Sequence, residues 1–391
     1  MMNFLKEPPK LNKKRIIILV AIIILIIAII SVIITYINNK SARDWIDKNI
    51  FRKEVTQNNL PKIDIEEINT SNIYAFNKYI GILDNNNFEI YDNAANKASE
   101  LTIEITTPIF NSNGRYLAIG EQKGQKLYLI EDKSIKWETD IEGDISSISV
   151  NSGGYVAVTI VDTNYKTVIM MFDNKGEALF KTFLSSTRVI ATSISDDNKY
   201  LSLAEVDTSG TVAQSRIKVI SIEKGKTDPE NSIVKTYEQN NSLIVNIKYQ
   251  EKNKLLCMYT DKITEIKQDA EEEEQIKELS SKNTAFASIE LSNSVVTVQE
   301  KSSGLFTADS EVSIINSSNQ DIAVYTANSV TKEIYTADNV IALNLGSEVE
   351  LISTNGWLVK RYTAEQEITG IVLSNSVAGI IYRNKIEIVN L

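Results

Sequence analysis

Two stretches of the sequence can be laid over each other without a gap. Val312–Thr326 reads VSIINSSNQDIAVYT, and Val349–Thr363 reads VELISTNGWLVKRYT. Each begins with an apolar-x-apolar-apolar run that ends in a polar residue, passes through a polar turn and closes with a second β-rich run. Alternation of this kind, interrupted by Asn, Ser and Gly, is typical of a β-hairpin. The two stretches therefore predict one hairpin that is repeated 37 residues further along the chain.

The opening run of this hairpin occurs eight times, and neighbouring copies start 37 to 49 residues apart. A second β-rich run precedes each copy, and further strand-like segments lie before and after most of them. Four short strands at this repeat length predict an all-β fold, a β-propeller of four-stranded blades. Eight blades are favoured; seven is the alternative if the unit at 242–283, where Glu265 occupies an apolar position, is irregular. The copies start at Phe88, Leu127, Ile169, Ile217, Ile263, Val312, Val349 and Ile386.

The last repeat lacks an outer strand, because the chain ends at Leu391 directly after the eighth opening run. The segment Lys62–Ile68 lies before the first complete blade and alternates as a strand should. We expect this segment to complete the last blade, since pairing the two ends of the ring removes an open sheet edge. Residues 62–391 then form one closed propeller.

The repeated units resemble the WD40-like and quinoprotein-dehydrogenase-like propellers, and Asn355-Gly-Trp-Leu-Val-Lys-Arg361 is typical of the outer hairpin of the second group. The chain as a whole resembles uncharacterised single-span membrane proteins of Firmicutes that carry such a domain outside the cell. The resemblance covers about residues 62–391 and implies the fold and an extracytoplasmic domain. It implies no cofactor, because the sequence has neither a WD dipeptide nor a cofactor-binding signature.

A membrane segment precedes the repeats. Residues 16–37 are 22 consecutive residues without a charge, and a helix of this length measures roughly 33 Å, enough for a hydrocarbon core of about 30 Å. A cleaved signal peptide and a buried core helix are the alternatives, but signal peptides have shorter apolar regions. The span predicts the lipid bilayer as a partner, and Trp45 beside it suits an interfacial anchor.

The basic cluster Lys13-Lys14-Arg15 abuts the span on its N-terminal side, which favours a cytoplasmic N-terminus. We therefore expect a single-pass protein of the cell membrane with its C-terminal domain outside the cytoplasm. The expected parts are a cytoplasmic tail (1–15), a transmembrane helix (16–37), a juxtamembrane linker (38–61) and a propeller ectodomain (62–391).

Composition excludes several functions. The 391 residues contain no His and a single Cys, Cys257, so His-based catalysis, His-ligated metals and intrachain disulfides are all excluded. Residues 1–53 carry a net charge of +7, which leaves −17 on the rest of the chain. An acidic domain argues against nucleic-acid binding, which needs a basic face. The sequence indicates no catalytic residue, no metal site and no cofactor.

Candidate partner-binding residues lie between second and third strands, where propeller loops are exposed and tolerate variation. The longest such segments are 205–216 and 299–310, and Phe306 is apolar in an otherwise polar stretch. The tripeptide Val-Asp-Thr occurs at 161–163 and again at 206–208, for which simple turn chemistry is the alternative explanation. The candidate loop residues are Asp207, Arg216, Lys301, Phe306 and Asp309, and the repeated loop aspartates are Asp162 and Asp207.

These observations favour a non-enzymatic scaffold, held at the membrane, that binds a protein, a peptide or a cell-wall ligand. The first alternative is a carboxylate-based hydrolase acting on surface glycans or small molecules, because the chain is rich in Asp and Glu. A sensor that signals through the span is a third reading, for which only 15 residues precede the membrane.

Overall fold

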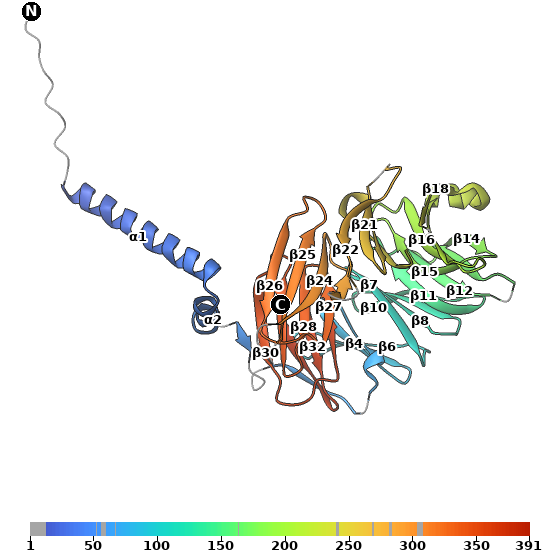
Figure 1. The fold of residues 1–391 in the computed structure, drawn as a ribbon. Coiled ribbons are helices and arrows are strands. Elements are labelled where there is room, and N and C mark those ends of the chain that lie inside the picture. The colour runs from blue at the N-terminus through green and yellow to red at the C-terminus, as the bar shows by residue number, and fades with distance from the viewer. Residues whose placement is uncertain are drawn as a thin grey trace, which may run out of the picture. The chain divides into compact units, whose positions relative to one another are not determined.

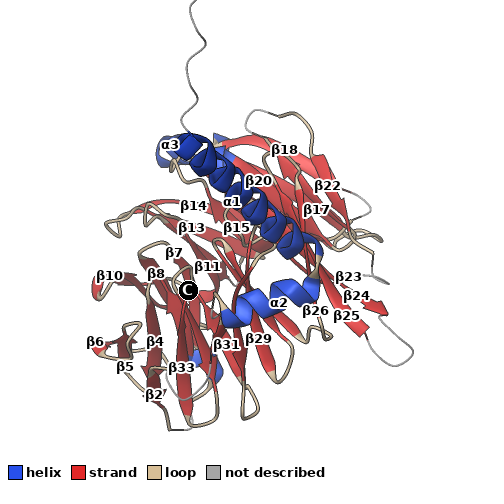
Figure 2. Cartoon of the chain, turned by 90° about the vertical axis from the view of Figure 1, so that its left-hand side faces the viewer, coloured by secondary structure: helices blue, strands red, loops and turns tan. Residues whose placement is uncertain are grey.

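The computed structural model describes residues 13–51, 53–55, 60–66, 68–162, 164–239, 242–267, 270–280, 284–302 and 308–391. The chain divides into two compact units, residues 1–55 and residues 56–391. The first is helical and the second consists almost entirely of strands (Figure 2).

The N-terminal unit consists of α1 (Lys13–Asn38), α2 (Lys40–Asn49) and the short strand β1 (Glu54–Val55). Within α1, Ile18–Asn38 is long and apolar enough to cross a membrane, with a mean hydropathy of 3.5, and its most apolar stretch is exposed. The Tyr36 hydroxyl donates to Asp47 Oδ1 (2.7 Å), and the Lys53 ammonium lies 2.9 Å from the same oxygen. Asp47 is buried, so this cluster fixes α2 against the end of α1.

The second unit contains eight sheets of four antiparallel strands arranged in sequence, as Figure 1 shows by its colours. Blades 1 to 4 are β3 (Ile73–Phe76), β4 (Tyr79–Asp84), β5 (Asn87–Tyr91), β6 (Lys97–Thr102); β7 (Pro108–Asn113), β8 (Tyr116–Glu121), β9 (Lys126–Glu131), β10 (Ser134–Asp140); β11 (Asp144–Val150), β12 (Val156–Val161), β13 (Thr167–Phe172), β14 (Ala178–Leu184); and β15 (Arg188–Ile194), β16 (Tyr200–Asp207), β17 (Gln214–Ser221), β18 (Ile233–Gln239).

Blades 5 to 8 are β19 (Ile244–Gln250), β20 (Lys254–Tyr259), β21 (Lys262–Ile266), β22 (Glu274–Glu278); β23 (Thr284–Ser288), β24 (Ser294–Ser302), β25 (Ala308–Asn316), β26 (Ile322–Ala327); β27 (Glu333–Ala337), β28 (Val340–Asn344), β29 (Glu348–Ser353), β30 (Leu358–Thr363); and β31 (Gly370–Leu373), β32 (Val377–Ile381), β33 (Lys385–Asn390), β2 (Lys62–Asp64). Short helices α3 (Ile222–Thr227), η2 (Thr70–Asn72), η3 (Pro229–Asn231) and η4 (Glu251–Asn253) connect strands. The expected eight-bladed propeller is confirmed, and strands β19 to β22 form a complete blade within the unit that left seven blades as the alternative.

The ring closes where the sequence predicted it to close. β2 pairs antiparallel with β33, with Ile63 opposite Ile386, and so supplies the outer strand of blade 8. The pairing is shorter than the expected 62–68, because the strand ends at Asp64. Ile63 is 3% exposed and packs with Ile73, Ile386 and Ile388, so apolar burial holds the first and last blades together.

The second strand of each blade is almost fully buried. Small residues recur within these strands, and Ala118, Ala157 and Ser202 have no exposed surface. Gly81 shows why such residues are small, since a Cβ there would lie 2.2 Å from the Phe88 ring of the neighbouring strand. Cys257 is likewise a buried core residue on β20.

Candidate functional site

The strands of a blade alternate in direction, so its turns alternate between two ends of the propeller. One end of the propeller carries the turns between first and second strands and those between third and fourth strands. We call it the channel end. The opposite end, with the hairpins between second and third strands, is the hairpin end. Two of the channel-end turns are tight: Asn77 and Asp338 each begin a two-residue connection with a positive φ, of 49° and 48°.

A polar cavity of about 200 Å³ lies between the first strands of blades 2 to 6. Its walls carry hydroxyl and amide groups that bridge neighbouring blades. Ser149 and Thr192 share a hydrogen bond of 2.8 Å, and Asn111 Oδ1 accepts from the Val150 amide at 2.9 Å. The groups that bridge these blades are neutral, and the charged residues of the same lining are Asp196, Lys248 and Glu290.

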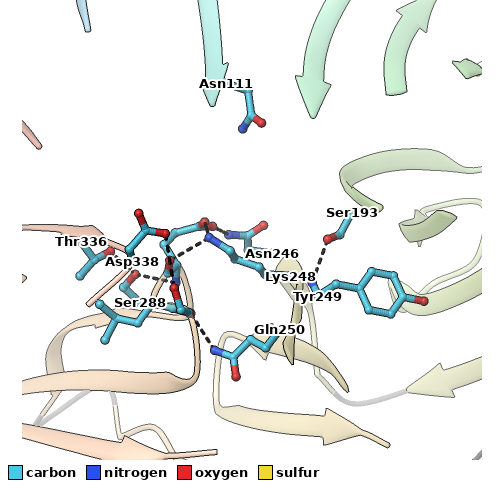
Figure 3. Close-up of polar contacts among 12 residues, drawn as sticks. Asn111, Ser193, Asn246, Lys248, Tyr249, Gln250, Ser288, Thr336 and Asp338 are labelled. Carbon is cyan, nitrogen blue, oxygen red and sulfur yellow. Dashed lines mark hydrogen bonds and ion pairs between the residues drawn. The ribbon is translucent and has the colours of Figure 1, made fainter. Parts of the chain in front are cut away.

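An ion pair between blades 5 and 6 is set into this wall. The Lys248 ammonium donates to Glu290 Oε2 (2.9 Å) and to the Glu290 carbonyl (2.8 Å), and the Asn246 amide donates to Glu290 Oε1 (2.7 Å). Figure 3 shows Asn246 and Lys248 on one side of the cluster and Ser288, Thr336 and Asp338 on the other. Lys248 is 28% exposed and Glu290 is 45% exposed, so both side chains stay accessible from the channel.

The Lys248–Glu290 pair is set up to remain charged. Burial within the ring tends to raise the pKa of Glu290, but the positive charge and hydrogen bond of Lys248 and the hydrogen bond of Asn246 together hold it below its ordinary value. Across the channel, burial raises the pKa of the Tyr74 phenol, an effect that Ser112 partly offsets by hydrogen bonding and that the Glu290 charge reinforces. A carboxyl group with a lowered pKa is deprotonated at neutral pH, so it cannot serve there as a proton donor.

The channel opens into a wider cavity of about 440 Å³ at the channel end. All eight blades contribute to its lining, and most of the residues come from the ends of first strands and the turns after them. Beside Lys248 and Glu290, the charged residues of this lining are Asp196, Glu251 and Asp338. Asp196 accepts from Ser152 (2.8 Å) and Asp338 from Ser292 (3.3 Å). The turn residues are Asn77, Asn113, Ser152, Asp196, Glu251, Ser292, Asp338 and Ser374.

The predicted residues of the blade 4 hairpin pair with one another. Arg216 Nη1 lies 3.4 Å from Asp207 Oδ2, and Arg216 Nε lies 3.0 Å from Glu238. Asp207 also accepts from the amide and the hydroxyl of Ser209 at 2.9 and 2.6 Å. Asp162 similarly accepts from the Asn164 amide at 2.7 Å. Both repeated aspartates thus organise their own turns, in line with the turn-chemistry alternative.

The two segments expected to be loops are partly strand, because the strands on either side extend into them. In segment 205–216, β16 runs to Asp207 and β17 starts at Gln214; in segment 299–310, β24 runs to Ser302 and β25 starts at Ala308. Lys301 lies opposite Asp309 in the β24–β25 register and forms an ion pair with Glu311. Cross-strand pairing continues beyond the blade because polar residues suit both exposed faces of a ribbon. Phe306 lies outside the described residues.

The structure brings Asp207 and Arg216 together on one hairpin and Lys301 and Asp309 on another, and it keeps the two hairpins in separate blades. The sequence analysis did not single out Lys248 or Glu290. A signal was present, since the first strands carry polar residues at alternate positions, as at Ser147 and Ser149. When the polar face of such a strand points to the inside of a ring, that face lines a channel.

In the described part of the chain, no three His, Cys, Asp or Glu residues are grouped so that they could hold a metal ion. The comparisons with known proteins agree with the fold. The C-terminal WD40 domain of Sif2 matches with a TM-score of 0.56 and 12% identity over 84% of this chain and 98% of that one. BamB from Moraxella catarrhalis matches with a TM-score of 0.51 and 13% identity over 84% and 96%.

Chaetomium thermophilum Sqt1, in a structure bound to the N-terminus of the ribosomal protein L10, matches with a TM-score of 0.51 and 10% identity over 85% and 100% of the two chains. At these identities the likeness concerns the fold. No protein with a curated description matches the sequence. A family model described as "Family of unknown function (DUF5711)" matches residues 52–391.

Proposed function

The chain belongs to the DUF5711 family of unknown function, and we propose that it is a membrane-anchored propeller that binds a protein, peptide or cell-wall ligand without catalysis. The observation that carries the proposal is the mouth of the central channel, a cavity of about 440 Å³ with a lining drawn from all eight blades. A concave site with convergent polar groups on a rigid scaffold is the usual form of a binding site.

The chemistry of the mouth suits a polar polymer. Hydroxyl and amide side chains such as those of Asn113, Ser152 and Ser292 both donate and accept hydrogen bonds, and so complement a peptide backbone or a sugar chain. The matching propeller Sqt1 was solved with a protein N-terminus bound, and by this analogy a protein or peptide ligand is favoured.

A carboxylate-based hydrolase is the alternative function. Such an enzyme needs two acids whose pKa values are pushed apart, with one raised so that it donates a proton. In the channel wall the pKa of Glu290 is lowered, and the Lys248 ammonium and the Asn246 amide occupy its oxygens. This arrangement supports binding better than acid–base catalysis.

Helix α1 supplies the proposed anchor. We place residues 1–15 in the cytoplasm, residues 16–37 in the bilayer, residues 38–61 at its outer surface and residues 62–391 outside the cell. Trp45, Ile50 and Phe51 are each more than half exposed in the segment that follows α1, as expected for groups at a membrane interface. Protease added to intact cells is expected to shed a large fragment; complete protection in cells that the protease can reach would contradict this topology.

The hairpin end remains a second candidate contact surface, formed by the hairpins that carry Asp207, Arg216, Lys301, Phe306 and Asp309. The exposure and the length of its ribbons support this surface. In the β24–β25 ribbon, cross-strand pairing extends as far as Ser302 opposite Ala308. Side chains at the end of such a ribbon do not pack in the core, so they are available to contact a partner.

Site-specific photo-crosslinking in intact cells tests the proposal. A photoreactive residue is placed at Asn113 or Ser292 in the mouth, at Ser209 on the hairpin end, and at Lys181 on an outer strand as a control. We expect the same adduct from Asn113 and Ser292 and none from Lys181. Adducts from Ser209 alone would move the site to the hairpin end, and absence of any adduct would count against a binding scaffold.

A further inference from the structure

A second cavity opens at the channel end between blades 4 and 5. It is a groove of about 320 Å³. Its walls are mainly apolar and aromatic: Tyr200 and Val234 belong to blade 4 with Tyr237, and Tyr249, Leu255 and Ile266 belong to blade 5. This volume lies at the lower end of the range for small-molecule pockets, so the groove has room for one large side chain and little more.

The polar lining of the groove is cationic. Lys224, Lys235 and Lys267 border it, and among the residues that the structure describes no Asp or Glu belongs to its lining. The net charge of residues 54–391 is −17, so three lysines around one groove stand apart from the rest of the propeller, although carboxylates outside the lining lie beside two of them. Its electrostatic complement is an anion with an apolar body.

The lysines differ in how far they are neutralised. Lys267 pairs with Glu274 and lies 3.4 Å from Glu265. Lys235 donates to the Ala270 carbonyl (2.8 Å), and its nearest carboxylate, that of Glu271, is 3.6 Å away and 91% exposed. In the part of the chain that the structure describes, the Lys224 ammonium has no carboxylate within 4.0 Å. Lys224 is therefore available to a ligand.

The groove and the channel mouth are neighbours along β19. Successive residues of a strand point to opposite sides, so Lys248 faces the channel while the Tyr249 ring points the other way (Figure 3). The Tyr249 amide donates its hydrogen to Ser193 Oγ (2.8 Å) and so is not available to donate to a ligand in the channel, and the phenol shares a hydrogen bond with Ser202 (2.9 Å). Tyr249 belongs to the lining of both cavities, so the groove adjoins the channel mouth at this residue.

We propose that the groove receives a large apolar side chain of an extended peptide that crosses the channel mouth, and that its lysines bind acidic residues next to that side chain. The inference rests on the proposed function and narrows its ligand to an acidic peptide with one aromatic or large aliphatic anchor. Aromatic anchors that fill a pocket dominate peptide affinity, and flanking charges select among partners.

The test uses the full chain in lipid nanodiscs and three fluorescein-labelled nine-residue peptides, measured by fluorescence anisotropy. One has a central Phe flanked by two Glu, the second has the Phe flanked by two Lys, and the third has Ser in place of the Phe. We expect the Glu-flanked Phe peptide to bind at least tenfold more tightly than the other two. Equal affinities, or no binding of that peptide at about 1 mM, would overturn the proposal.

Two substitutions with matched controls locate the binding. Val234→Trp fills the groove from the exposed outer strand of blade 4, and Val324→Trp places the same side chain on the exposed outer strand of blade 6. Lys224→Ala removes the unpaired ammonium, and Lys226→Ala removes the neighbouring lysine, which pairs with Glu223 outside the groove. We expect losses of at least twentyfold for Val234→Trp and about fivefold for Lys224→Ala, and changes below about twofold for the controls.

The channel-mouth variant Ser152→Trp separates this inference from the proposed function. If Ser152→Trp abolishes binding of the Glu-flanked Phe peptide and Val234→Trp leaves it unchanged, the mouth binds the peptide and the groove proposal is wrong. If both variants weaken binding with unchanged melting temperatures, the groove proposal is supported. If the crosslinks from Asn113 and Ser292 form while no peptide binds, the proposed scaffold function is supported and the assignment of an acidic peptide as its ligand is wrong.

Discussion

The two ends of the propeller use their polar side chains in different ways. At the hairpin end, Arg216 pairs with Asp207 and Glu238 of its own blade. At the channel end, Lys248 of blade 5 pairs with Glu290 of blade 6, and the residues around them come from every blade. Charges that belong to one β-ribbon satisfy each other locally, whereas polar groups from separate blades converge on a cavity. A ring of blades therefore forms its central cavity where strands of different blades meet.

The largest expected difference between the two ends concerns ligand binding. Ser152→Trp places an indole over the channel mouth from an exposed position, and we expect it to lower the yield of the mouth crosslink, or the affinity of the identified partner, at least a hundredfold. Ser209→Trp makes the same change at the hairpin end and is expected to alter binding less than about threefold. The reverse order would show that the ligand sits on the hairpins.

Phe306→Ala tests whether the hairpin end adds a contact. If the hairpin of blade 6 contacts the partner in addition to the mouth, we expect the truncation to weaken partner binding by about 2 kcal/mol, as for an aromatic anchor, and to leave the melting temperature unchanged. A pull-down and a melting curve on the same preparation check this. A joint loss of stability and binding would mean that Phe306 packs on its own blade and contacts no partner.

The ion pairs of the two ends should differ in their effect on stability. Lys248→Met leaves the Glu290 carboxylate without its cation inside the ring, and we expect the free energy of unfolding to fall by about 1–2 kcal/mol. Arg216→Met breaks a long contact of 3.4 Å with Asp207, which is 14% exposed, and a pair with Glu238, which is 59% exposed, so a loss of about 0.5 kcal/mol or less is expected. Denaturant unfolding of both variants measures the difference; equal losses would contradict it.

The smallest effect is a pH dependence confined to the channel. Because folding lowers the pKa of Glu290 below its ordinary value of 4.5, its contribution to stability is present above that pH and is lost as the pH falls through the lower, folded-state pKa. We expect the wild-type melting temperature to drop about 2 °C more than that of Glu290→Gln between about pH 6 and pH 3. Parallel curves for the two proteins would show that Glu290 titrates normally.

Much of the architecture follows from short-range patterns. The eight opening runs became the third strands β5, β9, β13, β17, β21, β25, β29 and β33. Alternation with a period of two is a local property of the chain, and a repeat of constant length carries it from blade to blade, so neither depends on knowing the ring. Closure by the segment around Ile63 was equally predictable. The last repeat lacked one strand, and pairing with this segment removes the unpaired edge that would otherwise remain.

The candidate site was less predictable. The sequence drew attention to Asp207, Arg216 and Lys301 because they occupy the longest segments between strands, and the structure uses their charges within their own hairpins. The polar positions on the first strands were visible, but alternation shows only that Asn246 and Lys248 share one face of β19.

Hydrophobic pattern, repeat length and composition act over a few residues at a time. They encoded the propeller class, the number of blades, the closing strand and the apolar helix. The meeting of Lys248 with Glu290, 42 residues away, depends on how two blades pack around the ring. So does the groove that Val234 and Tyr249 share. Such pairings arise from the twist and spacing of whole sheets, which no local stretch of sequence specifies.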